Sequence, residues 1–196
     1  MKSKLAQVMM EREEKKPLDG RVEMDDAYLG GERSDGKRGR GAPGKRPFVA
    51  AIQTTYEGAP VRMKLRRVKR FSKEEIKALA EKHLKKTARV VTDGLACFNG
   101  IAEAGIAHQR LVVKELGHSE KLSDFKWVNT TLGNIKSAIT GTYRGARKHA
   151  GRTLAEFEYR FNRRFDLTTI IPRLGWAAVH TPPMPYRLLK MTEDST

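Results

Sequence analysis

One short run, residues 20–31, limits what this chain can fold into more than any other part of it. Apolar and polar side chains alternate from Val22 to Met24, two aspartates follow, and a glycine pair closes the run. This alternation is typical of a β-strand that ends in a turn. Because neighbouring side chains of a strand point to opposite faces, Asp25 is expected on one face with Glu23, and Val22 on the other with Met24. A carboxylate on a central strand is costly unless it is paired or binds metal, and a pair of turn aspartates is the plain alternative.

Composition excludes several classes of protein. The chain of 196 residues is long enough for one domain with its own core, and its mean hydropathy is -0.59, which fits a soluble protein. No apolar run approaches the roughly 18 residues that cross a membrane, and the charged N-terminus is not a secretory signal. The one cysteine, Cys97, excludes an internal disulfide and a cysteine-built zinc site, so we expect it to be buried. The net charge of +16 favours a polyanionic partner, although ribosomal and membrane-surface proteins share this property.

The remaining patterns predict further strands and helices. Strands are predicted at residues 47–55, 61–68, 88–92 and 109–113. Helices are predicted at residues 1–12, 72–84, 95–104, 127–140 and 153–165, two of them behind capping boxes that begin at Ser72 and Thr153. The first three strands form a meander, whereas the fourth is reached through a helix and is expected to be parallel to its neighbour. This order predicts an α/β fold of the RNase H-like, retroviral-integrase-like type, with a mixed five-stranded sheet flanked by helices.

Asp93 is a candidate for a functional site. It ends the predicted strand 88–92 and stands directly before Gly94. Open α/β sheets place functional residues at the carboxyl ends of their strands. An ordinary Asp-Gly turn is the alternative.

A third site residue is expected from the helix 127–140, where Asn129 and Asn134 compete. A helix turns by about 100° per residue, so Lys136 lies within about 20° of Asn129, while Asn134 is rotated from Asn129 by about 140°. Asn129 and Lys136 therefore share a face beside the apolar stripe that should pack on the sheet. This geometry favours Asn129, and Asn134 stays open.

Five segments together resemble the bacterial insertion-sequence transposases of the DDE type, in which the triad is often Asp-Asp-Asn followed by Lys. The resemblance covers about residues 1–190, and the first and last segments together are quite specific. There are 35 residues between Asp93 and Asn129, similar to the spacing common in DDE recombinases. The segments are Val22-Glu23-Met24-Asp25-Asp26-Ala27-Tyr28-Leu29-Gly30-Gly31, Thr92-Asp93-Gly94, Trp127-Val128-Asn129-Thr130, Gly141-Thr142-Tyr143-Arg144 and Glu156-Phe157-Glu158-Tyr159-Arg160-Phe161-Asn162-Arg163-Arg164.

The resemblance implies a metal-dependent transposase that cleaves and joins DNA strands with two Mg²⁺ or Mn²⁺ ions. It implies that Asp25 bridges both ions, that Asp93 and Asn129 each hold one, and that Lys136 contacts DNA. The expected partners are the element ends and target DNA, together with further copies of the chain in a homodimer or higher oligomer, in the bacterial cytoplasm at the nucleoid. The basic side chains expected to contact DNA are Lys37, Arg38, Arg40, Lys45, Arg46, Lys64, Arg66, Arg144, Arg163 and Arg164.

The glycine-rich segment 32–46 holds five of these cations and cannot bury apolar area. It fits a phosphate-binding arm, and a solvated linker is the alternative.

One departure from the family pattern concerns the N-terminus. Full-length relatives begin with a zinc ribbon and a helix-turn-helix, and this chain has neither. We therefore expect residues 1–16 to be the last helix of such a head, residues 17–180 to be the catalytic domain and residues 181–196 to be an extended tail. Two other functions remain open: a catalytically inactive nucleic-acid-binding remnant of a transposase, and a basic structural protein of a ribonucleoprotein. Of these three, only an active transposase requires Asp25, Asp93 and Asn129 to converge.

Overall fold

The computed structural model describes residues 2–29, 45–111, 125–141 and 149–190. Its strands are β1 (Arg21–Leu29), β2 (Arg46–Thr54), β3 (Pro60–Arg67), β4 (Arg89–Thr92) and β5 (Ala107–Arg110). Its longer helices are α1 (Lys2–Glu14), α2 (Lys73–His83), α5 (Lys126–Thr140), α6 (Ala150–Phe161) and α7 (Ile170–Val179). The shorter helical turns are η1 (Ala96–Asn99), α3 (Gly100–Glu103), η3 (Leu167–Thr169) and α8 (Tyr186–Lys190). None of the helices in these ranges is long and apolar enough to cross a membrane.

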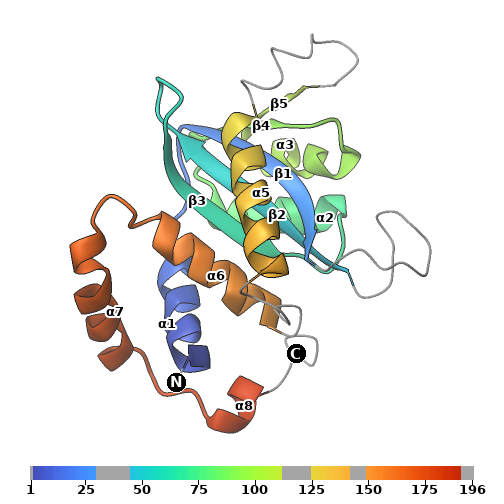
Figure 1. Ribbon diagram of the computed structural model, residues 1–196. Coiled ribbons are helices and arrows are strands. Elements are labelled where there is room, and N and C mark those ends of the chain that lie inside the picture. The colour runs from blue at the N-terminus through green and yellow to red at the C-terminus, as the bar shows by residue number, and fades with distance from the viewer. Residues whose placement is uncertain (1, 30–44, 112–124, 142–148, 191–196) are drawn as a thin grey trace.

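The five strands form one mixed sheet in the order β3-β2-β1-β4-β5. β1, β2 and β3 form the predicted antiparallel meander, and β4 pairs in parallel with both β1 and β5. The predicted parallel pairing of the fourth strand is therefore confirmed. With helices on both faces, this is the mixed sheet of an RNase H-like fold, as the order of elements predicted (Figure 1).

Each face of the sheet has its own hydrophobic core, and β1 contributes to both. Val22 and Met24 belong to the core that α2, η1 and α3 cover, and Cys97 is buried there as expected. Ala27 and Leu29 belong to the core beneath α5 and α6. The alternation along β1 therefore has the predicted direction, and it places Asp25 on the α5 face of the sheet.

Side chains of α6, and of the residue that follows it, form hydrogen bonds with the edge strand β3. The Asn162 side chain, just after α6, accepts a hydrogen bond from the backbone N–H of Met63 at 2.7 Å and donates one to its carbonyl at 3.1 Å. The buried Glu158 accepts a hydrogen bond from the N–H of Leu65 at 2.9 Å. These contacts occupy backbone groups that an edge strand would otherwise offer to another chain. α1 packs in turn against α6, beside β3 (Figure 1).

Several boundaries differ from the predicted ones. β5 spans Ala107–Arg110, earlier than residues 109–113, of which Val112 and Val113 lie outside the described ranges. Ser72 does cap α2, since its side chain accepts a hydrogen bond from the N–H of Glu75. The second capping box is wrong as a helix start, because α6 begins at Ala150 and Thr153 lies inside it. Ala150 packs into the core, so the helix starts earlier than the polar pattern indicates.

The C-terminal part of the chain is more helical than predicted. α6 ends at Phe161, so Phe165, the last residue of the predicted helix, lies beyond it and is 83% exposed. α7 follows, with Pro172 in its first turn, where a proline is tolerated. The short helix α8 lies within the segment that was expected to be extended.

Candidate metal and catalytic site

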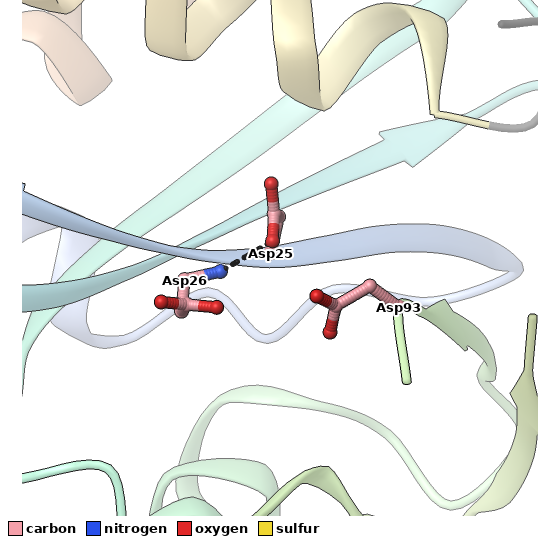
Figure 2. Close-up of side chains that lie close together, drawn as sticks. All are labelled: Asp25, Asp26 and Asp93. Carbon is pink, nitrogen blue, oxygen red and sulfur yellow. Dashed lines mark hydrogen bonds between the residues drawn. The ribbon is translucent and has the colours of Figure 1, made fainter. Parts of the chain in front are cut away.

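Three aspartates meet where β1 runs past the end of β4. Asp25 and Asp26 lie on β1, and Asp93 follows β4. One carboxylate oxygen from each of the three lies within 4.8 Å of the other two. Figure 2 shows the Asp25 side chain directed toward the helix above the strand, Asp26 on the opposite side of the strand, and Asp93 beside both.

The strand register explains this convergence. The parallel pairing of β1 with β4 ends where Met24 lies opposite Thr92, so the next residues, Asp25 and Asp93, leave the pairing side by side. Asp93 is held there by a local turn in which its Oδ1 accepts a hydrogen bond from the N–H of Leu95 at 3.0 Å. Asp25 and Asp93 therefore meet as predicted, because β4 ends beside the middle of β1.

Asp26 was not expected in this group. Strand alternation assigned it to the opposite face from Asp25, and Figure 2 shows that the two side chains do diverge. Beyond Met24, however, β4 no longer pairs with β1, so side chains from both faces of β1 can reach toward Asp93. The only signal in the sequence was its position beside Asp25.

The environment of Asp25 disfavours its negative charge. Burial raises the pKa of Asp25 to about 6, and repulsion from Asp93 and Asp26 adds to this, while a hydrogen bond from the Asp26 N–H and the positive charge of Lys136 oppose it. The hydrogen bond to Asp25 Oδ1 is 2.8 Å long. Half-buried carboxylates that repel one another form a site that a cation would stabilise.

A buried glutamate of β1 holds the beginning of α5. Glu23 is 1% exposed, and its Oε2 accepts hydrogen bonds from the backbone N–H groups of Trp127 at 2.9 Å and Val128 at 3.0 Å. Its Oε1 accepts one from Arg21 at 2.9 Å. The first N–H groups of a helix have no partner inside it and carry partial positive charge, so a carboxylate stabilises them. Sequence analysis had placed Glu23 on the face of Asp25 but had given it no role.

The two flanks of α5 lie over different strands. The indole N–H of Trp127 donates to the carbonyl of Gly58, in the turn between β2 and β3, so this flank faces that hairpin. Asn134 is seven residues further on and shares the flank of Trp127 within about 20°. Lys136 lies on the other flank and is close enough to Asp25 to lower its pKa. Asn129 and Asn134 are both exposed.

The predicted DNA contacts fall into three groups. Lys37, Arg38, Arg40 and Arg144 lie outside the described residues. Lys45 and Arg46 stand beside the end of β1, since Arg46 pairs with Leu29 and the Lys45 ammonium lies 5.7 Å from the centre of the Tyr28 ring. The remaining cations have partners within the protein.

Lys64 and Arg66 lie at the junction of α1, β3 and α6. Lys64 is 1% exposed, approaches Glu158 at 3.5 Å and donates to the carbonyl of Glu13. Arg66 forms ion pairs with Glu158 and Glu14. Both were predicted to contact DNA, but they lie on one face of β3, and the end of α1 covers that face. We therefore assign both a structural role.

Arg163 and Arg164 also bind within the protein. Arg163 pairs with Glu13 at 2.5 Å. Arg164 donates to the carbonyls of Pro60 and Val61 at the start of β3. These contacts join the end of α6 to α1 and to the sheet edge.

A comparison with known protein families identifies the family of this chain. Residues 17–162 match the ISXO2-like transposase domain. A comparison with curated proteins gave no match. The family match covers well over half of the 196 residues and includes the whole sheet, Asp25, Asp93 and α5. The resemblance to DDE transposases is thus confirmed, and the chain belongs to the ISXO2-like transposase family.

Proposed function

We propose that this protein is a transposase that cleaves DNA strands and transfers them to a target, with divalent metal ions as cofactors. The observation that carries the proposal is the convergence of Asp25 and Asp93, with Asp26, at one end of the sheet. A basic structural protein would not need to bring these carboxylates together at the cost of their mutual repulsion.

The aspartates suit a hard divalent cation. Carboxylate oxygens are the ligands that Mg²⁺ and Mn²⁺ prefer, and the oxygens of three carboxylates lie within reach of one another. Burial and neighbouring charge raise the pKa of Asp25, so a cation would relieve unfavourable charge there. When bound, such ions stabilise the charge that develops on phosphoryl oxygens and favour deprotonation of an attacking hydroxyl or water.

Asn129 is proposed as the third ligand, in preference to Asn134. Lys136 lies near Asp25, and Asn129 shares its flank of α5, whereas Asn134 shares the flank of Trp127, which faces the β2–β3 turn. Glu23 holds the first turn of α5 against β1 and so fixes the position of Asn129 relative to Asp25. Asp26 is the second candidate for this ligand, because its carboxylate already belongs to the cluster.

Lys136 is proposed to bind a DNA phosphate beside the acidic site. Its side chain is exposed, and its charge acts on Asp25. A cation in this place would attract a phosphodiester and hold it next to the carboxylates. Lys45 and Arg46, at the end of β1, are proposed as further contacts on the same DNA.

The test is nicking and strand transfer on supercoiled plasmid and labelled duplex DNA with Mn²⁺, comparing the wild-type chain with Asp25→Ala and Asp93→Ala. We expect cleavage only by the wild type, while all three proteins bind DNA with similar affinity, because binding rests on cations. Equal cleavage by the variants would overturn the assignment of the site. Binding without cleavage by the wild type would favour the inactive remnant.

A further inference from the structure

A second candidate site lies beside β3, away from the aspartates. It is a pocket of about 620 Å³ formed where the end of α1 meets β3, α6 and α7. Figure 1 shows α1, α6 and α7 toward the β3 edge of the sheet, whereas β4 and β5 form its other end. β2 lies between β3 and β1, so the pocket is separate from the cluster around Asp25.

The pocket is strongly basic. Its one carboxylate, Glu13, is buried and already accepts hydrogen bonds from Arg163 at 2.5 Å and from the Asn162 side chain at 2.7 Å. It therefore does not neutralise the other cations. Six cationic side chains line the pocket: Arg12, Lys15, Lys16, Arg62, Arg163 and Arg173.

Three of these cations are available to a ligand. Lys15 and Lys16 are exposed, and Arg62 is half-buried at the pocket wall. Across the described ranges, no carboxylate forms an ion pair with any of the three. Arg173 has an exposed partner, Asp166, at 3.0 Å, a kind of pair that contributes little and exchanges readily. Cations that gather without counter-charges repel one another, and a polyanion would relieve this repulsion.

We propose that this pocket binds the sugar-phosphate backbone of DNA. The inference rests on the proposed function, which makes DNA the polyanion that the protein meets. Lysine and arginine side chains that project from separate elements suit phosphates spaced along a strand, and such contacts hold DNA without recognising its sequence. DNA bound in this pocket would have a second contact with the protein, across the sheet from the aspartates at which a DNA strand would react.

The first test compares two triple variants with the same loss of charge. One removes Lys15, Lys16 and Arg62, each replaced by alanine. The matched control is Lys77→Ala, Lys85→Ala and Arg89→Ala, which removes three cations from α2, the following turn and the start of β4. Affinity for a fluorescent 40-base-pair duplex is measured in EDTA over a range of salt concentrations, so no cleavage occurs.

We expect the pocket variant to lose on the order of a hundredfold in affinity at 0.1 M salt, and its log-log salt slope to fall by about 3. The control variant should stay within roughly threefold of the wild type, since a general loss of charge acts weakly without direct phosphate contacts. Equal losses in the two variants would overturn the proposal. Circular dichroism and urea unfolding confirm that both variants are folded.

The second test is a local one. Trp176 lines the pocket, and Trp127 is the other of the two tryptophans in the chain. In a Trp127→Phe variant, the emission of Trp176 therefore reports on the pocket. We expect duplex DNA to change this emission with the same Kd as the anisotropy titration. Unchanged emission while DNA binds would overturn the proposal.

Other ligands are distinguished by the same reporter. Inorganic phosphate that saturates the emission change below about 1 mM would reassign the pocket to a small anion, since a single phosphate contact is weak. Tighter binding of an RNA of equal length would reassign it to RNA.

The experiments can contradict the proposed function and the proposed DNA binding by the pocket independently of each other. Wild-type protein that never cleaves, but whose affinity depends on the pocket cations, would contradict the proposed function and leave the pocket supported. Wild-type protein that cleaves DNA, together with triple variants that bind DNA equally, would support the proposed function and contradict the pocket proposal. Asp25→Ala, which changes only the acidic site, should retain the full salt slope.

Discussion

The Glu23 carboxylate accepts a hydrogen bond from the backbone N–H of Val128 at 3.0 Å, so a side chain of β1 caps the helix that carries Asn129 and Lys136. Because Glu23 is two residues before Asp25 on the same face of β1, a single strand both supplies the first aspartate and positions α5 above it. The distance between strand and helix is thus set by a buried charged group rather than by apolar packing alone.

Replacing Glu23 with alanine is expected to lower the free energy of unfolding by roughly 3 kcal/mol. The substitution removes the acceptor of two backbone N–H groups at the start of α5 and of one hydrogen bond from Arg21. Glu23→Gln keeps the shape but not the charge, and it should lower the free energy of unfolding by roughly half as much. Urea unfolding measures both. Glu103→Gln, an exposed partner of Lys73, is the control and should stay within about 0.5 kcal/mol of the wild type.

Asp25→Asn is expected to stabilise the metal-free protein while it abolishes cleavage. The pKa of Asp25 is raised from its ordinary 3.8 to about 6, so the folded protein binds a proton more tightly than the unfolded chain between these values. The stability of the wild type should therefore fall as pH rises through that range. The Asp25→Asn variant should not lose this stability, because its side-chain amide does not ionise. The gain at pH 7.5 should be on the order of 2 kcal/mol and should vanish near pH 4.

The measurement is thermal and urea unfolding in EDTA from pH 4 to pH 8. Asp19→Asn is the matched control with the opposite sign, because hydrogen bonds from Thr87 and the Gly20 N–H lower the pKa of Asp19 to about 2. Removing that charge should destabilise the protein above the ordinary pKa of aspartate. An Asp25→Asn variant that is less stable than the wild type at pH 7.5 would contradict the proposed electrostatics.

Asn129→Ala is expected to reduce Mn²⁺-dependent cleavage by at least roughly tenfold, the effect usual for a weakened metal site. Asn134→Ala should change it by less than about twofold, because that side chain lies on the opposite flank of α5. Both residues are exposed, so neither variant should lose stability beyond about 0.5 kcal/mol. Asp26→Asn completes the set: loss of cleavage in Asp26→Asn together with full activity of Asn129→Ala would assign the third ligand to Asp26.

Asn162→Ala is expected to destabilise the protein by roughly 2 kcal/mol and to promote association through β3. The substitution removes the hydrogen bonds to both backbone groups of Met63 and exposes them on an edge strand. Urea unfolding and light scattering test the two effects. Asn99→Ala, an exposed asparagine on η1, is the control. A variant as stable as the wild type would show that α6 holds the edge without this side chain.

Replacing Lys37, Arg38 and Arg40 with alanine tests the basic arm that the sequence predicts in residues 32–46. If each cation contacts a phosphate, the log-log salt slope of DNA binding should fall by about 3, equally on all DNA sequences. Anisotropy titrations at several salt concentrations measure the slope. An unchanged slope would identify the segment as a solvated linker.

Local patterns in the sequence were sufficient for the sheet and for the two central aspartates. Alternation in β1, the apolar run of β4 and the helix before β4 predict a parallel pair, and Asp25 and Asp93 stand where the pairing of these two strands ends. The burial of Cys97 and the cap of α2 at Ser72 are similarly local. These features depend on neighbours a few residues apart, which is the range over which periodicity carries information.

Only the tertiary structure decided what the charged side chains do. Lys64 and Arg66 lie on one face of β3, but the end of α1 covers that face, and the buried Glu158 pairs with both side chains. Asp26 joined the aspartates because β4 stops at Thr92, and Glu23 found its partners more than a hundred residues away. A charge pattern along a strand shows which face a side chain takes. What covers that face depends on packing between distant parts of the chain, and this determines whether a cation meets DNA or a buried carboxylate.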